Sequence, residues 1–403
     1  MNPNYNRTLY ACYTGYVVQA IVNNFIPLLF LTFADTYHIS MTRITVLITF
    51  NFMIQLAIDL LSAGFIDRIG YRAAAVLAHA FAAAGLVLLT ILPEALPDPF
   101  LGLVLSVIIY ALGGGLLEVL LSPIVEALPT ENKEKTMSLL HSFYSWGQVG
   151  VVLVSTIFFS LFGIENWKWM ALVWACVPAA NLLVFIKAPI CALVSEDEEG
   201  IPFWNLIRTP VFWVLIVVMT CAGASEQAVS QWASAFAEEG LGVAKAIGDL
   251  AGPMFFGVCM GSSRLIYGLY GHRMDLQKTL VGSGLLCVLS YCLISLSPIP
   301  ALSLLGCGVC GFSVGIMWPG TFSIAASILR GGGTVLFAFL ALAGDLGCSG
   351  GPTLVGLITE HAGSNMKFGI LCAIVFPSLL AAGVILIRIM TRKTRAVSQA
   401  EPS

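Results

Sequence analysis

The sequence predicts an all-α polytopic membrane protein with 12 transmembrane helices in two pseudo-symmetric six-helix bundles and both termini cytoplasmic, and three observations lead there. Of the 403 residues, 58% are hydrophobic and only 10% are charged, whereas a soluble domain is about half apolar and a quarter charged. Apolar runs of about 20 residues, the length that crosses a bilayer, recur along the whole chain. One long polar connection near the middle separates these runs into two sets of equal number.

The expected spans follow from apolar runs bounded by charged residues, Pro and Gly. Numbered one to twelve, they lie at 10–34, 42–65, 73–93, 99–128, 136–163, 166–187, 210–236, 244–270, 278–296, 300–329, 334–359 and 365–388. The expected domains are therefore an N-terminal bundle (1–190), a cytoplasmic linker (191–209), a C-terminal bundle (210–390) and a cytoplasmic tail (391–403). The acidic run at 196–199 in the linker is typical of a solvated segment.

The distribution of positive charge predicts the orientation. Of the 19 Lys and Arg residues, only Arg43, Lys168, Lys245 and Lys367 fall on the outer side when the N-terminus is placed in the cytoplasm, and Arg264 falls within a span. An excess of Lys and Arg in cytoplasmic connections is the usual bias of membrane proteins. The short connections favour a bacterial inner membrane and leave no room for a soluble catalytic domain.

Several classes of function and partner are excluded. A net charge of −3 and the lack of a basic tract argue against a nucleic-acid partner. The cysteines form no metal-ligand pattern, and no phosphate loop or nucleophile motif is present. We therefore expect no enzyme activity, no metal and no cofactor. The expected partners of this monomer are the lipid bilayer, a small polar solute and a coupling ion.

An internal repeat relates the two halves. Gly115–Pro123 (GLLEVLLSP) aligns with Gly311–Pro319 (GFSVGIMWP), and Gly147–Gly150 aligns with Gly344–Gly347 at nearly the same offset. Span four therefore corresponds to span ten, and span five to span eleven. Transporters built from two related bundles bind their solute near the bilayer midplane, between the repeats.

The connection after span two carries a recognisable motif. It reads Asp67-Arg68-Ile69-Gly70-Tyr71-Arg72, which resembles the D-R-x-G-x-R element of the major facilitator superfamily. The resemblance extends over nearly the whole chain and implies that superfamily's fold. It also implies that Asp67, Arg68 and Arg72 form a cytoplasmic latch that holds the outward-open state.

Four shorter patches resemble the fucose permease-like branch of sugar–proton symporters. They are Gly113–Pro123 with Glu118, Leu140–Tyr144 with His141, Gly223–Trp232 with Glu226, and the pair Trp318-Pro319. The resemblance implies sugar transport coupled to protons. Ser122 stands where the branch has Asn, and the first span carries amides in place of an acid, so the sugar and the proton stoichiometry stay open.

Acidic side chains within the spans are the candidates for coupling. A carboxylate inside a bilayer is costly unless it faces a cavity or a partner, so Glu118, Asp345 and Glu226 are the expected proton-coupling groups. Asp59 lies nearer the cytoplasm, and we interpret it as a structural hydrogen-bonding residue. Arg264 either extends to the cytoplasmic surface or pairs with an acid.

Amide, hydroxyl and aromatic side chains near these acids are the candidates for the solute. Sugar hydroxyls need both donors and acceptors, and the C–H face of a sugar packs on aromatic rings. Gln19 and Asn23 lie four residues apart, on one face of a helix. The expected solute-binding residues are Gln19, Asn23, Asn24, Glu118, His141, Tyr144, Glu226, Gln227, Gln231, Trp232 and Trp318. Each also has a structural reading, as a helix–helix contact or packing residue.

The predicted function is secondary active transport of a small polar solute, a monosaccharide by resemblance, through alternating access with proton coupling. Three alternatives remain open. The first is a drug or metabolite–proton antiporter, although span five lacks the G-P-x-x-G-G-like signature of that class. The second is a sodium-coupled sugar transporter, because carboxylates and amides also suit that ion. The third is a non-transporting membrane receptor on the same fold.

Overall fold

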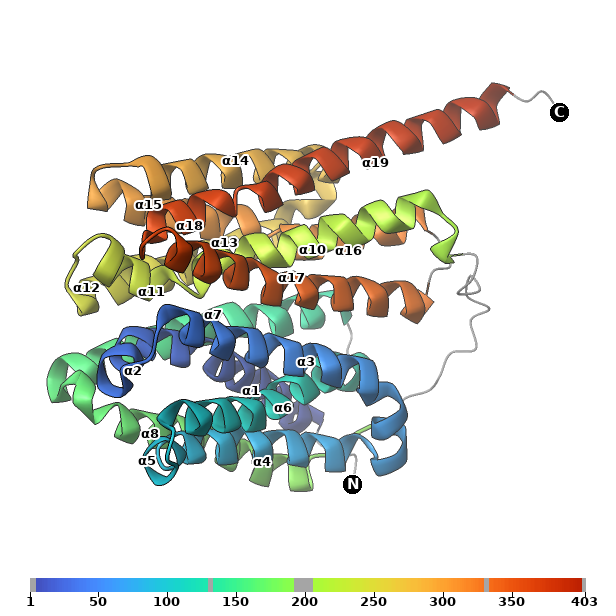
Figure 1. The fold of residues 1–403 in the computed structure, drawn as a ribbon. Coiled ribbons are helices and arrows are strands. Elements are labelled where there is room, and N and C mark those ends of the chain that lie inside the picture. The colour runs from blue at the N-terminus through green and yellow to red at the C-terminus, as the bar shows by residue number, and fades with distance from the viewer. Residues whose placement is uncertain (1–4, 130–132, 192–205, 330–332, 401–403) are drawn as a thin grey trace.

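The computed structural model describes residues 5–129, 133–191, 206–329 and 333–400. Within these ranges the chain is helical and contains no β-strand. The acidic linker run at 196–199 lies outside the described residues. Figure 1 shows the helices running side by side in two groups, one above the other. The first and last described helices, and the described residues that flank the linker, end on the same side of the molecule. We call this the linker end and the opposite one the far end.

The first group contains the helices of the N-terminal half. They are α1 (Tyr5–Asn24), η1 (Ile26–Leu29), α2 (Phe30–Tyr37), α3 (Met41–Ile69), α4 (Tyr71–Leu89), α5 (Leu92–Ala95), α6 (Pro99–Glu126), α7 (Lys133–Phe162), η2 (Ile164–Asn166) and α8 (Trp167–Lys187). Local sequence explains the helix ends. Asp98 accepts from the Phe100 backbone N–H and precedes Pro99 at the first position of α6, a cap and a residue suited to a helix start. Gly70, at φ 81°, separates α3 from α4, a conformation that favours glycine.

The second group contains the helices of the C-terminal half. They are α10 (Pro210–Ser230), α11 (Ala233–Ala235), η3 (Phe236–Gly240), α12 (Lys245–Asp249), η4 (Leu250–Met254), α13 (Phe255–Tyr270), η5 (Gly271–Arg273), α14 (Leu276–Leu296), α15 (Pro300–Val314), α16 (Met317–Ile328), α17 (Gly333–His361), α18 (Met366–Cys372) and α19 (Val375–Ala400). Several predicted spans are therefore interrupted helices in the structure. The run 244–270 contains a π-helical turn at Pro253, and 300–329 breaks between Val314 and Met317.

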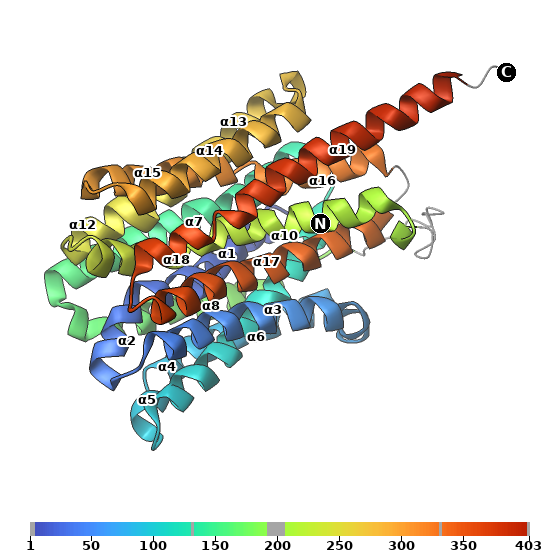
Figure 2. The ribbon, with the colours of Figure 1, turned by 45° about the horizontal axis from the view of Figure 1, so that its top comes forward.

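Length and composition qualify ten stretches of the described chain as candidate membrane spans. Each of them overlaps one predicted span. Predicted span eight corresponds to the segment from α12 to α13, and predicted span eleven corresponds to α17. Both lie among the other helices in Figure 2. The expectation of all-helical, membrane-spanning architecture is confirmed, and the count of twelve and the cytoplasmic termini stay predictions. The predicted tail at 391 begins within a helix, because α19 continues to Ala400.

Helix contacts repeat from one half to the other. In the N-terminal half α4 packs on α6 and α8, and α1 packs on α6, α7 and α8. In the C-terminal half α14 packs on α15 and α19, and α10 packs on α15, α17 and α19. The equivalent helices therefore make equivalent contacts, as the sequence repeat requires.

Two seams join the halves. Helix α3 packs along α17, and α7 packs along α13, and Figure 1 shows α3 and α17 side by side. In the far-end half of the first seam the hydroxyls of Thr49 and Thr353 lie 2.6 Å apart. Inside the C-terminal half, α17 approaches α10 so closely that a Cβ at Gly347 would overlap the Thr220 carbonyl oxygen. Small residues at such crossings let helix backbones approach in membranes.

Candidate functional site

A polar cluster lies at mid-depth between the halves, and its N-terminal part begins on α1. Gln19 donates through Nε2 to Glu118 Oε2 of α6 at 2.9 Å. Three residues earlier on α1, the Tyr16 hydroxyl lies 3.1 Å from Ser122 Oγ, also on α6. Gln19 and Glu118 are thus held against each other by direct contact between α1 and α6.

Asn23 connects three helices of the N-terminal half. Its Oδ1 accepts from Asn51 Nδ2 at 3.0 Å and from Gln55 Nε2 at 2.8 Å, both on α3. Its Nδ2 donates to the Tyr144 hydroxyl of α7 at 3.4 Å. All of these amide side chains are at most 5% exposed. Buried amides with defined partners present fixed donors and acceptors, which is what recognition of an uncharged polar solute requires.

The C-terminal half contributes an ion pair and two amides. Arg264 of α13 contacts Glu226 Oε2 of α10 through Nη2 at 3.3 Å. Gln227 Nε2 donates to Glu226 Oε1 at 3.3 Å, and Gln231 Nε2 donates to Gln227 Oε1 at 3.0 Å. The charge of Glu226 is therefore balanced inside the bundle by Arg264. Such pairing is expected, because an unpaired charge in an apolar medium is costly.

Three hydrogen bonds connect the two parts of the cluster across the halves. Gln231 Nε2 donates to the Asn23 carbonyl oxygen at 3.1 Å. Arg264 Nη1 donates to Ser145 Oγ at 3.1 Å. Gln148 Nε2 donates to Ser230 Oγ at 3.1 Å. The polar site is therefore shared by the two halves, so any relative movement of the halves must rearrange it.

Three carboxyl groups meet beside this cluster. Asp59 of α3, Glu118 of α6 and Asp345 of α17 each offer an oxygen, and these oxygens all lie within 4.8 Å of one another. Two ionised carboxylates at that separation repel by roughly 3 kcal/mol at an effective dielectric constant of about 20. Among the described residues, neither Glu118 nor Asp345 forms an ion pair with Lys or Arg. We call Asp59, Glu118 and Asp345 the acid triad.

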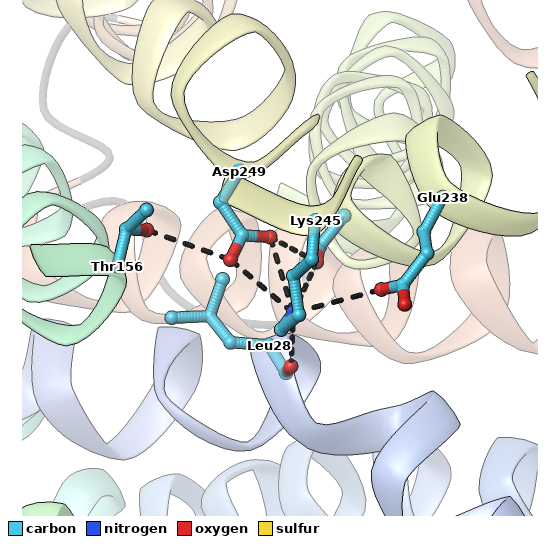
Figure 3. Close-up of polar contacts among 6 residues, drawn as sticks. Leu28, Thr156, Glu238, Lys245 and Asp249 are labelled. Carbon is cyan, nitrogen blue, oxygen red and sulfur yellow. Dashed lines mark hydrogen bonds and ion pairs between the residues drawn. The ribbon is translucent and has the colours of Figure 1, made fainter. Parts of the chain in front are cut away.

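A second charged cluster lies at the far end, shown in Figure 3. Lys245 Nζ lies 3.2 Å from Asp249 Oδ2 and 3.9 Å from Glu238 Oε2, within the C-terminal half. It also donates across to the Leu28 carbonyl oxygen at 2.7 Å. Thr156 of α7 donates to Asp249 Oδ2 at 3.4 Å. Since Asp249 is only 1% exposed, this cluster ties the halves together in the interior of the far end.

Several residues predicted for the solute site have other contacts in this structure. Trp232 is 1% exposed, and its Nε1 donates to the Pro352 carbonyl oxygen of α17 at 2.9 Å. Asn24 donates to the Ala20 carbonyl oxygen of its own helix. His141 is exposed and lies edge-on to the Tyr16 ring. Trp318 is half-buried and packs near Phe322. Their roles in solute binding stay predictions.

Sequence reasoning missed part of the site. It assigned Asp59 to structure and did not single out Asn51 or Gln55. A signal was present, because these three residues follow one another at intervals of four within an apolar span. Residues four apart lie on one face of a helix. A polar stripe of this kind on α3 indicates an interior face. Lys245 and Asp249 show the same spacing at the far end.

The predicted cytoplasmic latch is only partly described. Arg72, at the start of α4, donates through Nη1 to the Ile186 carbonyl oxygen of α8 at 2.8 Å. Arg68 is exposed. The side chain of Asp67 lies outside the described residues. The latch stays a prediction.

Solved structures of transporters share this architecture. A bacterial homologue of the human lysosomal transporter Spinster, in an inward-facing and occupied conformation, matches with a TM-score of 0.73 at 15% identity, over 96% of this chain and 97% of that one. A D-xylose–proton symporter matches with a TM-score of 0.77 at 12% identity, over 95% and 97%. The E. coli fucose:proton symporter matches with a TM-score of 0.65 at 16% identity, over 95% and 99%. At these identities the similarity is one of fold.

Comparison by sequence gives the family. No curated protein matches the chain. The family model of the Major Facilitator Superfamily matches residues 12–352, which is most of the chain and runs from α1 of the N-terminal half into α17 of the C-terminal half. The apolar helices, the repeated contacts and the shared interior polar site agree with that match. The chain belongs to the Major Facilitator Superfamily of integral membrane transporters.

Proposed function

We propose that this protein is a secondary active transporter that moves a small uncharged polar solute, a monosaccharide in the first instance, by alternating access coupled to protons. One observation carries the proposal. The buried network of Asn23, Gln231 and Glu226 draws its donors and acceptors from both halves. A solute bound there contacts both halves, and rocking of one half against the other changes the side from which it is reached.

The chemistry of the site favours a polyol over an ion or an apolar drug. The amides of Gln19, Asn23, Gln227 and Gln231 can both donate and accept, and the Tyr144 hydroxyl does the same. The single charged pair, Glu226 with Arg264, is balanced within the protein. The similarity in fold to fucose–proton and xylose–proton symporters supports the same reading.

The far-end cluster supports an assignment of conformational state. Lys245, Thr156 and Asp249 connect the halves at the far end, and the excess of positive charge supports the linker end as the cytoplasmic one. The structure then corresponds to a state closed to the outside. In the outward-open state the latch of Asp67, Arg68 and Arg72 would hold the cytoplasmic side closed instead. We place the transporter as a monomer in a bacterial inner membrane.

The experiment is solute counterflow in proteoliposomes. Vesicles loaded with unlabelled fucose, xylose or glucose are diluted into trace labelled sugar, with no ion gradient. We expect transient accumulation of the label for one of these sugars, and its loss in Glu226→Gln. Glu165→Gln, the same change at an exposed far-end residue, is the matched control and should behave as wild type. Absence of counterflow with all three sugars, from protein that elutes as a folded species, would refute the assignment of substrate class.

A further inference from the structure

Two amides of α3 converge on one oxygen of α1. Asn51 Nδ2 and Gln55 Nε2 both donate to Asn23 Oδ1, at 3.0 and 2.8 Å. These positions are ten and fourteen residues after Met41, where α3 begins, or about 15 and 21 Å along the helix at 1.5 Å per residue. Direct packing between α1 and α3 is sparse in the described ranges, so the amides connect two helices that are not closely packed on each other.

Asn23 has its polar atoms engaged by protein groups. Its Oδ1 accepts from the two α3 amides, and its Nδ2 donates to the Tyr144 hydroxyl at 3.4 Å. Its main-chain oxygen accepts from Gln231 Nε2 across the halves at 3.1 Å. That oxygen is available to Gln231 because Pro27, four residues on, has no N–H for the usual helical bond. Asn23 is therefore better suited to hold its neighbours in place than to bind a solute itself.

The same contacts fix the orientation of the Asn51 amide. Asn51 Nδ2 points to Asn23 Oδ1, and a flipped amide would lose this bond and place two oxygens against each other. Asn51 Oδ1 is therefore turned away from Asn23 Oδ1. It has no hydrogen-bond partner among the described residues, although Asn51 is only 5% exposed. Buried amide oxygens without a donor are uncommon and costly, so this oxygen is an acceptor that a ligand can use.

We propose that Asn51 is a specificity-determining residue, whose Oδ1 accepts a hydrogen bond from one hydroxyl of the bound solute, and that Asn23 positions it. The inference rests on the proposed function and deepens it, since it assigns one contact to the solute. The contact requires a donor, so a hydroxyl or N–H of the solute satisfies it, and an ether oxygen or a fluorine does not. A solute held by Asn51 lies close to the bond between Asn23 and Gln231, which joins the two halves.

Binding can be measured without transport. Fucose, xylose and glucose are titrated into the purified full-length protein, and the rise of the thermal midpoint with sugar concentration gives the affinity. The sugar that binds most tightly is then compared with its monodeoxyfluoro analogues, one for each non-anomeric hydroxyl. Fluorine is similar to a hydroxyl in size and polarity but cannot donate a hydrogen bond. In wild type, fluorination of the hydroxyl that faces Asn51 should weaken binding roughly tenfold, as expected for one lost hydrogen bond to a buried group.

Asn51→Leu identifies the hydroxyl that faces Asn51. Leucine has nearly the shape of asparagine, and Asn23 Oδ1 keeps Gln55 as a donor, so the change leaves no new buried group without a partner. The variant should bind the parent sugar roughly tenfold more weakly, and fluorination at one ring position should then have no further effect. Gln55→Met is the matched control, because it removes the other donor to Asn23 Oδ1 and leaves Asn51 in place. It should keep the wild-type fluorine penalty at every ring position.

Asn23→Leu tests the positioning role. Asn51 stays in this variant but loses its acceptor on α1, so the fluorine penalty should shrink at the same ring position as in Asn51→Leu and at no other. A full penalty in Asn23→Leu would refute that role. Asn51→Ala removes the same oxygen as Asn51→Leu and replaces it in the test if the leucine variant does not elute as a folded species.

The pattern of affinities separates this contact from a structural role. Equal weakening of the parent sugar and all its analogues in Asn51→Leu, with every fluorine penalty kept, would overturn the proposal, and so would loss of the same penalty in Gln55→Met. Absence of binding by all three sugars would refute the inference together with the proposed substrate class. Binding with the expected pattern but without counterflow would support the inference and refute only the proposed transport.

Discussion

Closure of the far end gives the sharpest prediction, because Asp249 accepts from the Thr156 hydroxyl across the halves and from the Ser234 hydroxyl within one half. Thr156 of α7 donates to Asp249 Oδ2 across the halves at 3.4 Å. Replacing it in Thr156→Val keeps the shape of the side chain and removes only the donor. Asp249 keeps Ser234 and Lys245 as partners, so no charge is left unpaired. The variant should therefore fold and should favour the far-end-open state.

The size of the shift follows from the bond that is lost. A hydrogen bond to a charged group contributes about 1.5–3 kcal/mol to stability. The Thr156 contact is long, so we use the lower value. Since about 1.4 kcal/mol corresponds to a factor of ten in an equilibrium constant, the ratio of far-end-open to far-end-closed molecules should rise about tenfold.

The assay is the distance between spin labels at Ile91 and Ile299, which lie at the far end in the N-terminal and C-terminal halves. Both side chains are about half exposed, at 50% and 52%. Encoded spin-label amino acids leave the 11 native cysteines in place. The long-distance population should grow in Thr156→Val.

Ser234→Ala is the matched control, because Ser234 also donates to Asp249 but lies in the same half. It should leave the distribution near that of wild type. Equal distributions in Thr156→Val and wild type, or equal shifts in both variants, would refute the reasoning that this contact holds the far end closed.

Three further predictions concern packing and charge. Gly347→Val should abolish the monodisperse peak in detergent size-exclusion chromatography, because its Cβ would overlap the Thr220 carbonyl oxygen. Gly350→Ala has nothing within 4 Å of the new Cβ and should elute as wild type. Arg264→Met should lower the free energy of unfolding by about 3–5 kcal/mol, because it leaves Glu226 buried and unpaired. Adding Glu226→Gln should recover much of the lost thermal midpoint. No recovery in the double variant would contradict the pairing. Trp232→Phe should cost about 1 kcal/mol through loss of the bond to the Pro352 carbonyl oxygen. Trp169→Phe, at a 65% exposed indole, should not lower the thermal midpoint to the same extent.

Much of the fold was predictable because the bilayer imposes strong limits on sequence. Apolar runs and a charged linker indicated two bundles, and the match between Gly147–Gly150 and Gly344–Gly347 identified helices that occupy equivalent places in the two halves. Breaks inside spans were harder to foresee. The π-helical turn at Pro253 interrupts an apolar run. Because the composition of the run does not change there, composition alone predicts one continuous helix.

The site was predictable in its residue types and less so in its grouping. The sequence singles out Glu118, Asp345 and Glu226, because an acidic side chain in an apolar span is costly unless it faces a cavity or a partner. Which acids meet depends on helix pairing across the halves, and a single sequence does not contain that pairing. Asp59 was therefore separated from Glu118 and Asp345, although one oxygen of each lies within 4.8 Å of the others. Trp232 was predicted to bind the solute, but its indole bonds the Pro352 carbonyl oxygen of α17.

The most direct test of the account is concentrative uptake in proteoliposomes. Vesicles containing the purified protein are given labelled sugar with an acidic exterior, and the internal concentration is compared with that outside, with and without a protonophore. The account predicts accumulation above the external concentration that the protonophore abolishes and that Asp345→Asn lacks, while Glu165→Gln accumulates as wild type. Equilibration to the external concentration alone, unaffected by any proton or sodium gradient, would contradict ion-coupled transport and reduce the protein to a facilitator.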